Sequence, residues 1–371
     1  MKINKYHHVF TIVLLVVLVM SLSVSAENDF LAKLKGSGIK ADGTPIKVGI
    51  SSAELYSEFA ISLSGYPEWL LKKAGCEVTF VNPDFNLNTQ IGYFEDFAAM
   101  GKEIIIAQPV DDFALYDATK RMQEKGIKMF NTNHPVMAPD GTPIPDLYAG
   151  SPNKAMAEEA AKFFIEKAAG RKVKIVQLMG AMGQLIATQR DEAFRAIIAQ
   201  HPNIELVDSK ATDWMTEKAY PIMIDMLTAT PDLWGIYSQS DCILPGIWAA
   251  LEQAGKLYPV GHEKHIITVA IDGAPVALEK IREGYHDLTV EQSPYAMGCV
   301  VAKGVLMLAN GLSLPDSPNN LIEVRPVRIT SENVNEPSLW GNYGVPHDEL
   351  WPRTQEIFEY YKWPGDEKIY R

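Results

Sequence analysis

The feature that most constrains the fold is a strand–helix–strand pattern within residues 103–136. Residues 104–106 are three consecutive isoleucines, and so short a β-branched run indicates a buried parallel strand. Asp111 or Asp112 can cap the helix that follows, and Gly126 suits its end because it lacks a β-carbon. A second apolar strand comes next, and polar side chains follow both strands. Ligands of open α/β sheets bind at that edge, so the pattern predicts a site there.

The same alternation of strands and helices continues over residues 46–329. It predicts an α/β fold with parallel sheets covered on both faces. The stretch is too long for one comfortable sheet, so we expect two domains divided near Gly150. Residues 323–329 should be the last strand and lie at a sheet edge, because they contain a proline. Residues 335–371 leave the pattern but hold several tryptophans and tyrosines, so we expect them to pack on the body.

The first residues have the features of a signal peptide. A basic start precedes the apolar run at residues 10–19, and Val24-Ser25-Ala26 offers small residues where a signal peptidase would cut. The apolar run is short for a membrane span, although an uncleaved anchor is the alternative. We expect residues 1–26 to be removed and the remainder to be exported to the periplasm.

Composition excludes some classes of function. The formal net charge of −12 argues against a nucleic-acid binder, which would need a basic patch. No glycine-rich phosphate-binding motif is present. Three cysteines are an odd number, and buried free thiols are the expected state of all three.

Polar and aromatic residues recur just after the predicted strands. Together they combine planar hydrogen-bonding groups with rings, which is what sugars and polyols require for their hydroxyls and their apolar faces. The candidates are Tyr56, Phe59, Gln108, Asp111, Asn133, His134, Gln184, Thr188, Arg190, Trp214, Ser240, Asp241, Asp272 and Gln292.

Segments such as VGISSAELYSEFAISL, IIIAQPVDDFAL, LMGAMGQLIATQRDEAF, VAIDGAP and VEQSP follow one another in a familiar order and spacing. In these the chain resembles the periplasmic sugar-binding proteins of the ribose-binding type, which feed ABC importers. The resemblance implies a type I periplasmic binding fold, with two Rossmann-like lobes, a three-strand hinge and a cleft that closes on the ligand. It assigns residues 27–150 and 292–334 to the N-terminal lobe and residues 151–291 to the C-terminal lobe.

The resemblance also implies roles for the candidates. Phe59 and Trp214 would be stacking rings on opposite lobes, with Tyr56 compensating for a second ring that is absent at Ala60. The remaining implied contacts are Gln108, Asn133, His134, Thr188, Ser240, Asp241, Asp272 and Gln292.

Four of these positions depart from the family pattern. Asn133 and His134 stand where the family often has Asp and Arg, Thr188 stands where it often has Arg, and Ser240 stands where Asn is common. Two bidentate guanidinium clamps are thereby lost, so ribose itself is not transferred as the ligand.

Several candidates have plainer explanations. Asp241, Asp272 and Thr188 could cap the helices that follow them, and Asn133 could shape a turn before Pro135. Arg190 could brace its loop by a salt bridge instead of touching ligand. His134 could be a solvated loop histidine, and His262 and His265 lack a third metal ligand nearby.

We therefore expect a solute-binding protein that is not an enzyme, takes a monosaccharide or small polyol and delivers it to an ABC permease. It should need no cofactor or metal, bind no nucleic acid and act as a monomer. Two alternatives stay open. One is a sugar sensor that presents its ligand to a membrane receptor, and the other is a hydrolase with Asp241 and Asp272 as paired carboxylates.

Overall fold

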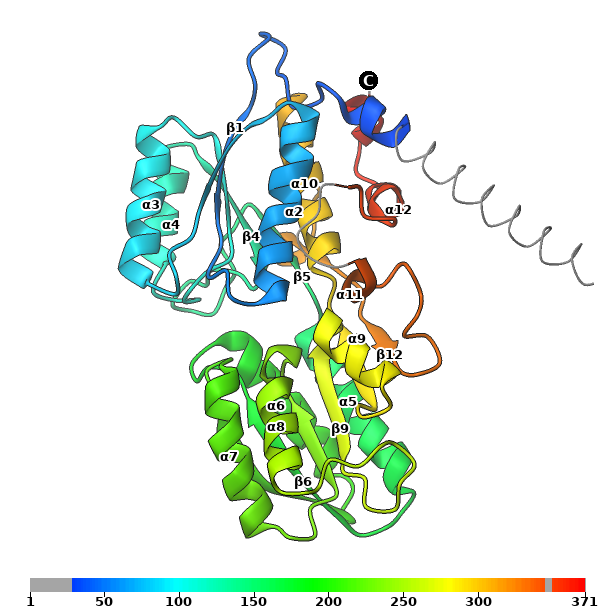
Figure 1. Cartoon of the computed structure of the whole chain (residues 1–371). Helices are drawn as coiled ribbons and strands as arrows, with labels where there is room; N and C mark the ends of the chain where they lie inside the picture. The colour runs from blue at the N-terminus through cyan, green and yellow to red at the C-terminus, as the bar shows by residue number, and fades with distance from the viewer. Residues whose placement is uncertain (1–28, 344–348, 371) are drawn as a thin grey trace, which may run out of the picture.

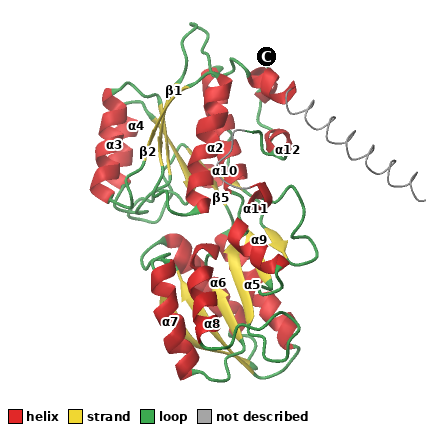
Figure 2. Ribbon diagram, viewed as in Figure 1, coloured by secondary structure: helices red, strands yellow, loops and turns green. Residues whose placement is uncertain are grey.

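The computed structural model describes residues 29–343 and 349–370, and the predicted signal peptide lies outside them. Two lobes lie one above the other, each with a sheet between layers of helices (Figures 1 and 2). The predicted α/β fold of the type I periplasmic binding class is confirmed.

The N-terminal lobe has a six-stranded parallel sheet in the order β11-β5-β4-β3-β1-β2. Its strands are β1 (Lys47–Ser51), β2 (Glu77–Val81), β3 (Ile104–Ala107), β4 (Lys128–Asn133), β5 (Leu147–Gly150) and β11 (Leu321–Glu323). Its helices are α2 (Glu58–Ala74), α3 (Leu87–Ala99), α4 (Tyr116–Glu124) and α10 (Pro294–Ala309).

The C-terminal lobe has a second six-stranded sheet in the order β12-β10-β9-β8-β6-β7, in which β12 alone runs antiparallel to its neighbour. Its strands are β6 (Val173–Met179), β7 (Ile204–Ala211), β8 (Gly235–Ser238), β9 (Ile267–Asp272), β10 (Leu288–Glu291) and β12 (Val327–Ile329). Its helices are α5 (Asn153–Ala168), α6 (Leu185–Ile198), α7 (Thr216–Ala229), α8 (Leu244–Gln253), α9 (Pro275–Arg282) and the short η1 (Asp241–Ile243).

The chain crosses between the sheets after β5, after β10 and between β11 and β12. The last crossing differs from the prediction of one strand at residues 323–329. Pro326 has no N–H to give to a ladder, and the stretch divides around it into two three-residue strands on different sheets. Residues 327–334 therefore belong to the C-terminal lobe, where Ile329 and Val334 pack with Leu278 of α9, and not to the N-terminal lobe.

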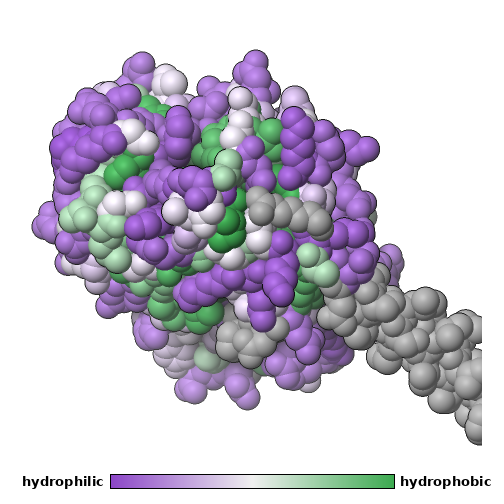
Figure 3. Space-filling view, turned by 90° about the horizontal axis from the view of Figure 1, so that it is seen from above, coloured by the Kyte–Doolittle hydropathy of each residue, from purple (hydrophilic) through white to green (hydrophobic). Residues whose placement is uncertain are grey.

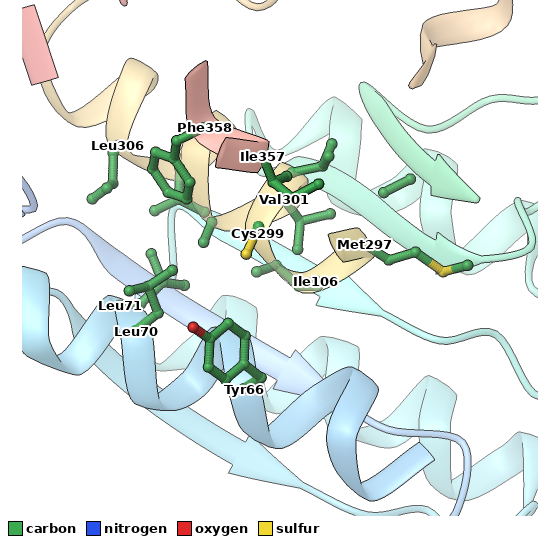
Figure 4. Packing of buried hydrophobic residues seen from close by; sticks show 14 of the residues in the cluster. Tyr66, Leu70, Leu71, Ile106, Met297, Cys299, Val301, Leu306, Ile357 and Phe358 are labelled. Carbon is green, nitrogen blue, oxygen red and sulfur yellow. The ribbon is translucent and has the colours of Figure 1, made fainter. Parts of the chain in front are cut away.

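The core of the N-terminal lobe lies between α2, α10 and the end of the chain. Figure 4 shows Tyr66 and Leu70 of α2 facing Cys299 and Val301 of α10, with Phe358 nearby. Phe358 belongs to α12 (Thr354–Tyr360), which follows the four-residue helix α11 (Trp340–Tyr343). The tryptophans of the C-terminal segment, Trp340, Trp351 and Trp363, are all buried.

Polar residues dominate the face seen in Figure 3, with smaller apolar areas between them. Among the described residues no helix is long and apolar enough to cross a bilayer. Cys76, Cys242 and Cys299 are free thiols, and Cys242 is the one that is not fully buried.

Candidate functional site

A small cavity of about 70 Å³ lies between the two lobes, at the carboxyl ends of both sheets. Both lobes contribute to its walls, so the cavity is an interlobe cleft. The lining residues are Ala53, Glu54, Tyr56, Ser57, Phe59, Phe85, Gln108, Pro109, Asn133, His134, Gln184, Ile186, Arg190, Trp214, Ser240, Cys242, Asp272 and Gln292.

Asp272 is the centre of the wall supplied by the C-terminal lobe. It ends β9 with a φ of 136°, a backbone conformation that residues with a β-carbon rarely adopt. One carboxylate oxygen accepts from the Ser240 hydroxyl and from the Asp241 N–H at 3.1 Å. The other accepts from Gln292 Nε2 at 2.6 Å. Three donors from the protein thus fix the orientation of this carboxylate.

Asp241 lies behind this wall and does not line the cavity. Its carboxylate accepts from the Ala274 N–H at 2.8 Å and from the Thr289 hydroxyl at 2.9 Å. Burial and the neighbouring Asp272 carboxylate raise the pKa of Asp241 well above its ordinary value. Burial also raises the pKa of Asp272, although the Arg190 charge opposes that shift. The structure thus places Asp241 behind Asp272 and outside the cavity wall predicted for it, a difference that the sequence could not give because both residues stand at or just after strand ends.

Arg190 of α6 lines the cavity and also has the bracing role that the sequence favoured, through hydrogen bonds in place of a salt bridge. Its Nε donates to Asn153 Oδ1 at 2.9 Å and its Nη1 to the Gln239 carbonyl at 2.6 Å. Its buried Nη2 has no hydrogen-bond partner among the described residues. Thr188, two residues earlier, is exposed and donates to the Gln184 carbonyl at 3.2 Å. Two residues turn a helix by more than half a circle, so Arg190 faces the cleft and Thr188 faces solvent.

Trp214 forms the aromatic part of the same wall. Asp213 and Trp214 both have positive φ, 53° and 62°, which turns the indole toward the cavity. Its Nε1 donates to Gln184 Oε1 at 2.6 Å. A β-carbon on Gly180 would lie 1.9 Å from the ring, so only glycine leaves room for the indole at this point. The Arg190 guanidinium lies 6.0 Å from the ring centre.

The opposite wall comes from the N-terminal lobe, and its rings stand on the loop after β1, the loop after β2 and α2. Tyr56 and Phe85 lie 5.9 Å apart, and Phe59 of α2 is partly buried. The Glu54 carboxylate holds this loop by accepting from the Ser57 N–H at 3.0 Å and from the Ser57 hydroxyl. Burial raises the pKa of Glu54.

Two amides complete the polar part of this wall. Gln108 accepts from the Ala53 N–H at 3.4 Å. Asn133 ends β4 with a φ of 68°, and its Oδ1 has no hydrogen-bond partner within the described chain.

His134 and Asp112 connect the lobes beside the cavity. His134 Nδ1 pairs with one oxygen of the Asp112 carboxylate, and the other oxygen accepts from the Leu185 N–H of α6 at 2.8 Å. Burial would raise the pKa of Asp112, but His134 and the Leu185 N–H lower it below its ordinary value. Asp112 was expected as a possible cap of α4 within its own lobe. In the structure it contacts the first turn of a helix in the other lobe, where a carboxylate is stabilised.

The cavity thus brings together nine of the eleven residues predicted as ligand contacts, all except Thr188 and Asp241. Several lining residues were not in that set, including Glu54, Ser57, Phe85 and Cys242. Gln184 and Arg190 were among the polar and aromatic residues that follow the predicted strands, although they were not predicted as ligand contacts. Asp111, another of those residues, is exposed and accepts from the N–H groups of Phe113 and Ala114. Within the described ranges no three His, Cys, Asp or Glu residues are grouped so as to hold a metal ion.

Comparison with known proteins agrees with this architecture. The family described as periplasmic binding protein domain matches residues 48–313. The ribose import binding protein of Bacillus subtilis is 26% identical over 288 residues, which cover 78% of this chain and 88% of that protein. The D-allose-binding periplasmic protein of Escherichia coli is 24% identical and covers 70% and 88% of the two chains.

Among solved structures, the Caulobacter myo-inositol binding protein bound to myo-inositol superimposes with a TM-score of 0.70 at 21% identity. The alignment covers 78% of this chain and 95% of that one. At that identity the likeness establishes the fold, and the family match extends over most of the chain. The protein belongs to the periplasmic binding protein domain family.

Proposed function

We propose that this chain is an exported solute-binding protein that captures a monosaccharide or small polyol and delivers it unchanged to a membrane ABC permease. The observation that carries the proposal is a set of buried polar atoms without partners among the described residues, on side chains that line the interlobe cavity. Asn133 Oδ1 and Gln292 Oε1 are acceptors, and Arg190 Nη2 is a donor. Leaving such buried groups unpaired costs free energy, so a ligand that satisfies all three is favoured.

A hydroxyl can both donate and accept, and a small polyhydroxylated ligand carries several hydroxyls close together. The rings of Tyr56, Phe59 and Trp214 would cover the C–H faces of a pyranose or furanose. The polar contacts would come from Gln108, Asn133, His134, Arg190, Ser240, Asp272 and Gln292. The names of the relatives, which refer to ribose and allose, support the same class of ligand.

The cleft favours binding over hydrolysis. The hydrolase alternative paired Asp272 with Asp241, which stays behind the wall with its oxygens occupied. Glu54, the second carboxyl group that lines the cavity, uses its oxygens to hold the Tyr56–Ser57 loop. The family and the predicted leader support a periplasmic location after removal of residues 1–26. We propose that the protein acts there as a monomer.

A thermal-shift screen of the mature chain tests the proposal. The panel should contain D-ribose, D-allose, L-arabinose, D-fucose, myo-inositol, glycerol and several nucleosides. One class of sugar or polyol should raise Tm by several degrees, because a ligand that binds the folded state alone stabilises it. Mass spectrometry should then recover that ligand intact. A panel without any shift, or recovery of a hydrolysed product, would contradict the proposal.

A further inference from the structure

The C-terminal segment lies beyond the residues that the family matches, yet it reaches the hinge and the cleft. After β12 the chain continues on the C-terminal lobe, where Leu339 packs with Leu278 and Ile281 of α9. Trp351 and Phe358 then lie in the core of the N-terminal lobe. Residues 339–342, here called the strap, lie where the chain passes from the C-terminal lobe back to the N-terminal lobe. Figure 1 shows α11 beside α9 where the two lobes meet.

Trp340 is the centre of the strap and touches both lobes. Its side chain is fully buried, and its ring lies 6.2 Å from the Phe59 ring in an edge-on arrangement. Phe59 belongs to α2 and lines the cavity on the N-terminal side. The indole Nε1 donates to the Asp272 carbonyl of the C-terminal lobe at 2.6 Å. Its backbone N–H donates to the Glu291 carboxylate at 3.0 Å.

The hydrogen bond to the Asp272 carbonyl matters because it holds the backbone of a residue that lines the cavity. Asp272 has the rare φ of 136°, and its backbone orientation decides where its carboxylate points in the cavity. The same carbonyl also accepts from the Gln292 N–H, but at 3.2 Å, which is longer than the bond from Trp340. The indole therefore supplies the shorter of two bonds that hold this backbone.

Gly341 allows the strap to approach so closely. A β-carbon there would lie 2.3 Å from the Gly273 carbonyl oxygen and 2.9 Å from a Leu278 methyl carbon. Such contacts cannot exist, so any larger residue would move the strap away from the end of β9. Asn342 fixes the other end of the strap, since its amide donates to the Val334 carbonyl at 2.7 Å.

We propose that the strap ties the two lobes together at the hinge and that Trp340 is a positioning residue for the Asp272 carboxylate in the cavity. Its consequence for ligand affinity rests on the function proposed above, but its effect on the Asp272 backbone does not. The strap holds the Asp272 backbone in its binding conformation in the absence of ligand, and it connects that strand end to the Phe59 side of the cleft.

The chain provides a matched control. Trp351 is also fully buried in the C-terminal segment, its ring stacks on Tyr295 at 5.6 Å, and its Nε1 has no hydrogen-bond partner among the described residues. Trp340→Phe removes a donor to the C-terminal lobe, whereas Trp351→Phe changes a ring of similar burial in the N-terminal lobe and removes no such bond.

Hydrogen exchange of the mature protein without ligand is the first test. Trp340→Phe should speed exchange about 10-fold in peptides covering residues 267–275 and 288–293, because the β9 end loses a bond that holds it. Trp351→Phe should leave those peptides unchanged. Gly341→Ala keeps the indole but displaces the strap, so it should reproduce the faster exchange, and it serves if Trp340→Phe does not fold. Equal exchange in all three variants would overturn the proposal.

Titration calorimetry with D-ribose, D-allose and myo-inositol is the second test. For any of these that binds the wild type, Trp340→Phe should weaken affinity about 3- to 10-fold, as expected for one lost hydrogen bond, and Trp351→Phe should change it less than about 2-fold. Equal affinities would overturn the positioning role. Failure of all probes to bind the wild type would count against the proposed function and leave the exchange test intact.

Discussion

The two walls of the cleft are built differently. Ser240, Asp272 and Gln292 on the C-terminal side are buried and bonded to one another, whereas Tyr56 and Phe85 on the N-terminal side are 53% and 36% exposed. The first wall is a hydrogen-bonded polar cluster with Trp214 beside it, and the second combines these half-exposed rings with the buried side chains of Gln108 and Asn133. From this contrast we propose that the C-terminal wall sets the orientation and affinity of a ligand, while the rings of the N-terminal wall cover it.

The largest expected effect is at Asp272. Asp272→Ala removes the acceptor that faces the cavity and leaves the donors of Ser240 and Gln292 unpaired. Affinity for the ligand found by the screen should fall about 100-fold, since charge-assisted hydrogen bonds are the strong ones. Titration calorimetry measures this loss. A circular dichroism melt of the ligand-free variant serves as the control, because relief of the repulsion between Asp272 and Asp241 should offset part of the cost of the unpaired donors and leave the fold intact. An unchanged affinity would show that the C-terminal wall does not determine ligand affinity through Asp272.

A direct comparison of the two walls gives a smaller effect. Trp214→Ala removes a ring that packs on Gly180 and is held by Gln184, and it should weaken affinity about 10-fold. Tyr56→Ala removes a half-exposed ring and should weaken affinity about 2- to 3-fold. The ratio of the two dissociation constants is the measurement. If Tyr56→Ala proved the more harmful change, the N-terminal wall would carry the affinity and the contrast would reverse.

The smallest expected effect concerns Glu291, which pairs with Asp272 across the parallel strands β9 and β10. Burial raises the pKa of Glu291 to about 7, above its ordinary value of 4.5. The folded protein therefore keeps a proton that the unfolded chain loses, and stability falls as pH rises from about 4.5 through about 7.

Glu291→Gln cannot titrate at this position, so its stability should fall less over the same range. Urea unfolding at pH 5 and pH 8 should show a difference between variant and wild type on the order of 1–3 kcal/mol, in favour of the variant at pH 8. Parallel curves for the two proteins would show that this carboxyl group does not titrate in that range.

Much of this organisation could be predicted because its signals are local. Isoleucine runs, helix caps and glycine ends set the order of strands and helices, and polar residues after strand ends marked the edge at which the cavity lies. Because these signals are local, they could not predict that the stretch at residues 323–329 divides between two sheets. Pro326 was expected to demote that stretch to an edge strand, but the sheet that each half joins depends on partners elsewhere in the chain.

The amino-acid sequence by itself determined two α/β lobes and a polar, aromatic set of residues at their strand ends, because side-chain periodicity and capping act over a few residues. The tertiary structure decided that Arg190 and not Thr188 faces the cleft and that Asp241 lies behind Asp272. It also decided that Asp112 bonds Leu185, 73 residues away, and that Trp340 bonds Asp272, 68 residues away. Such contacts follow from how the lobes pack on one another, and no local pattern records that geometry.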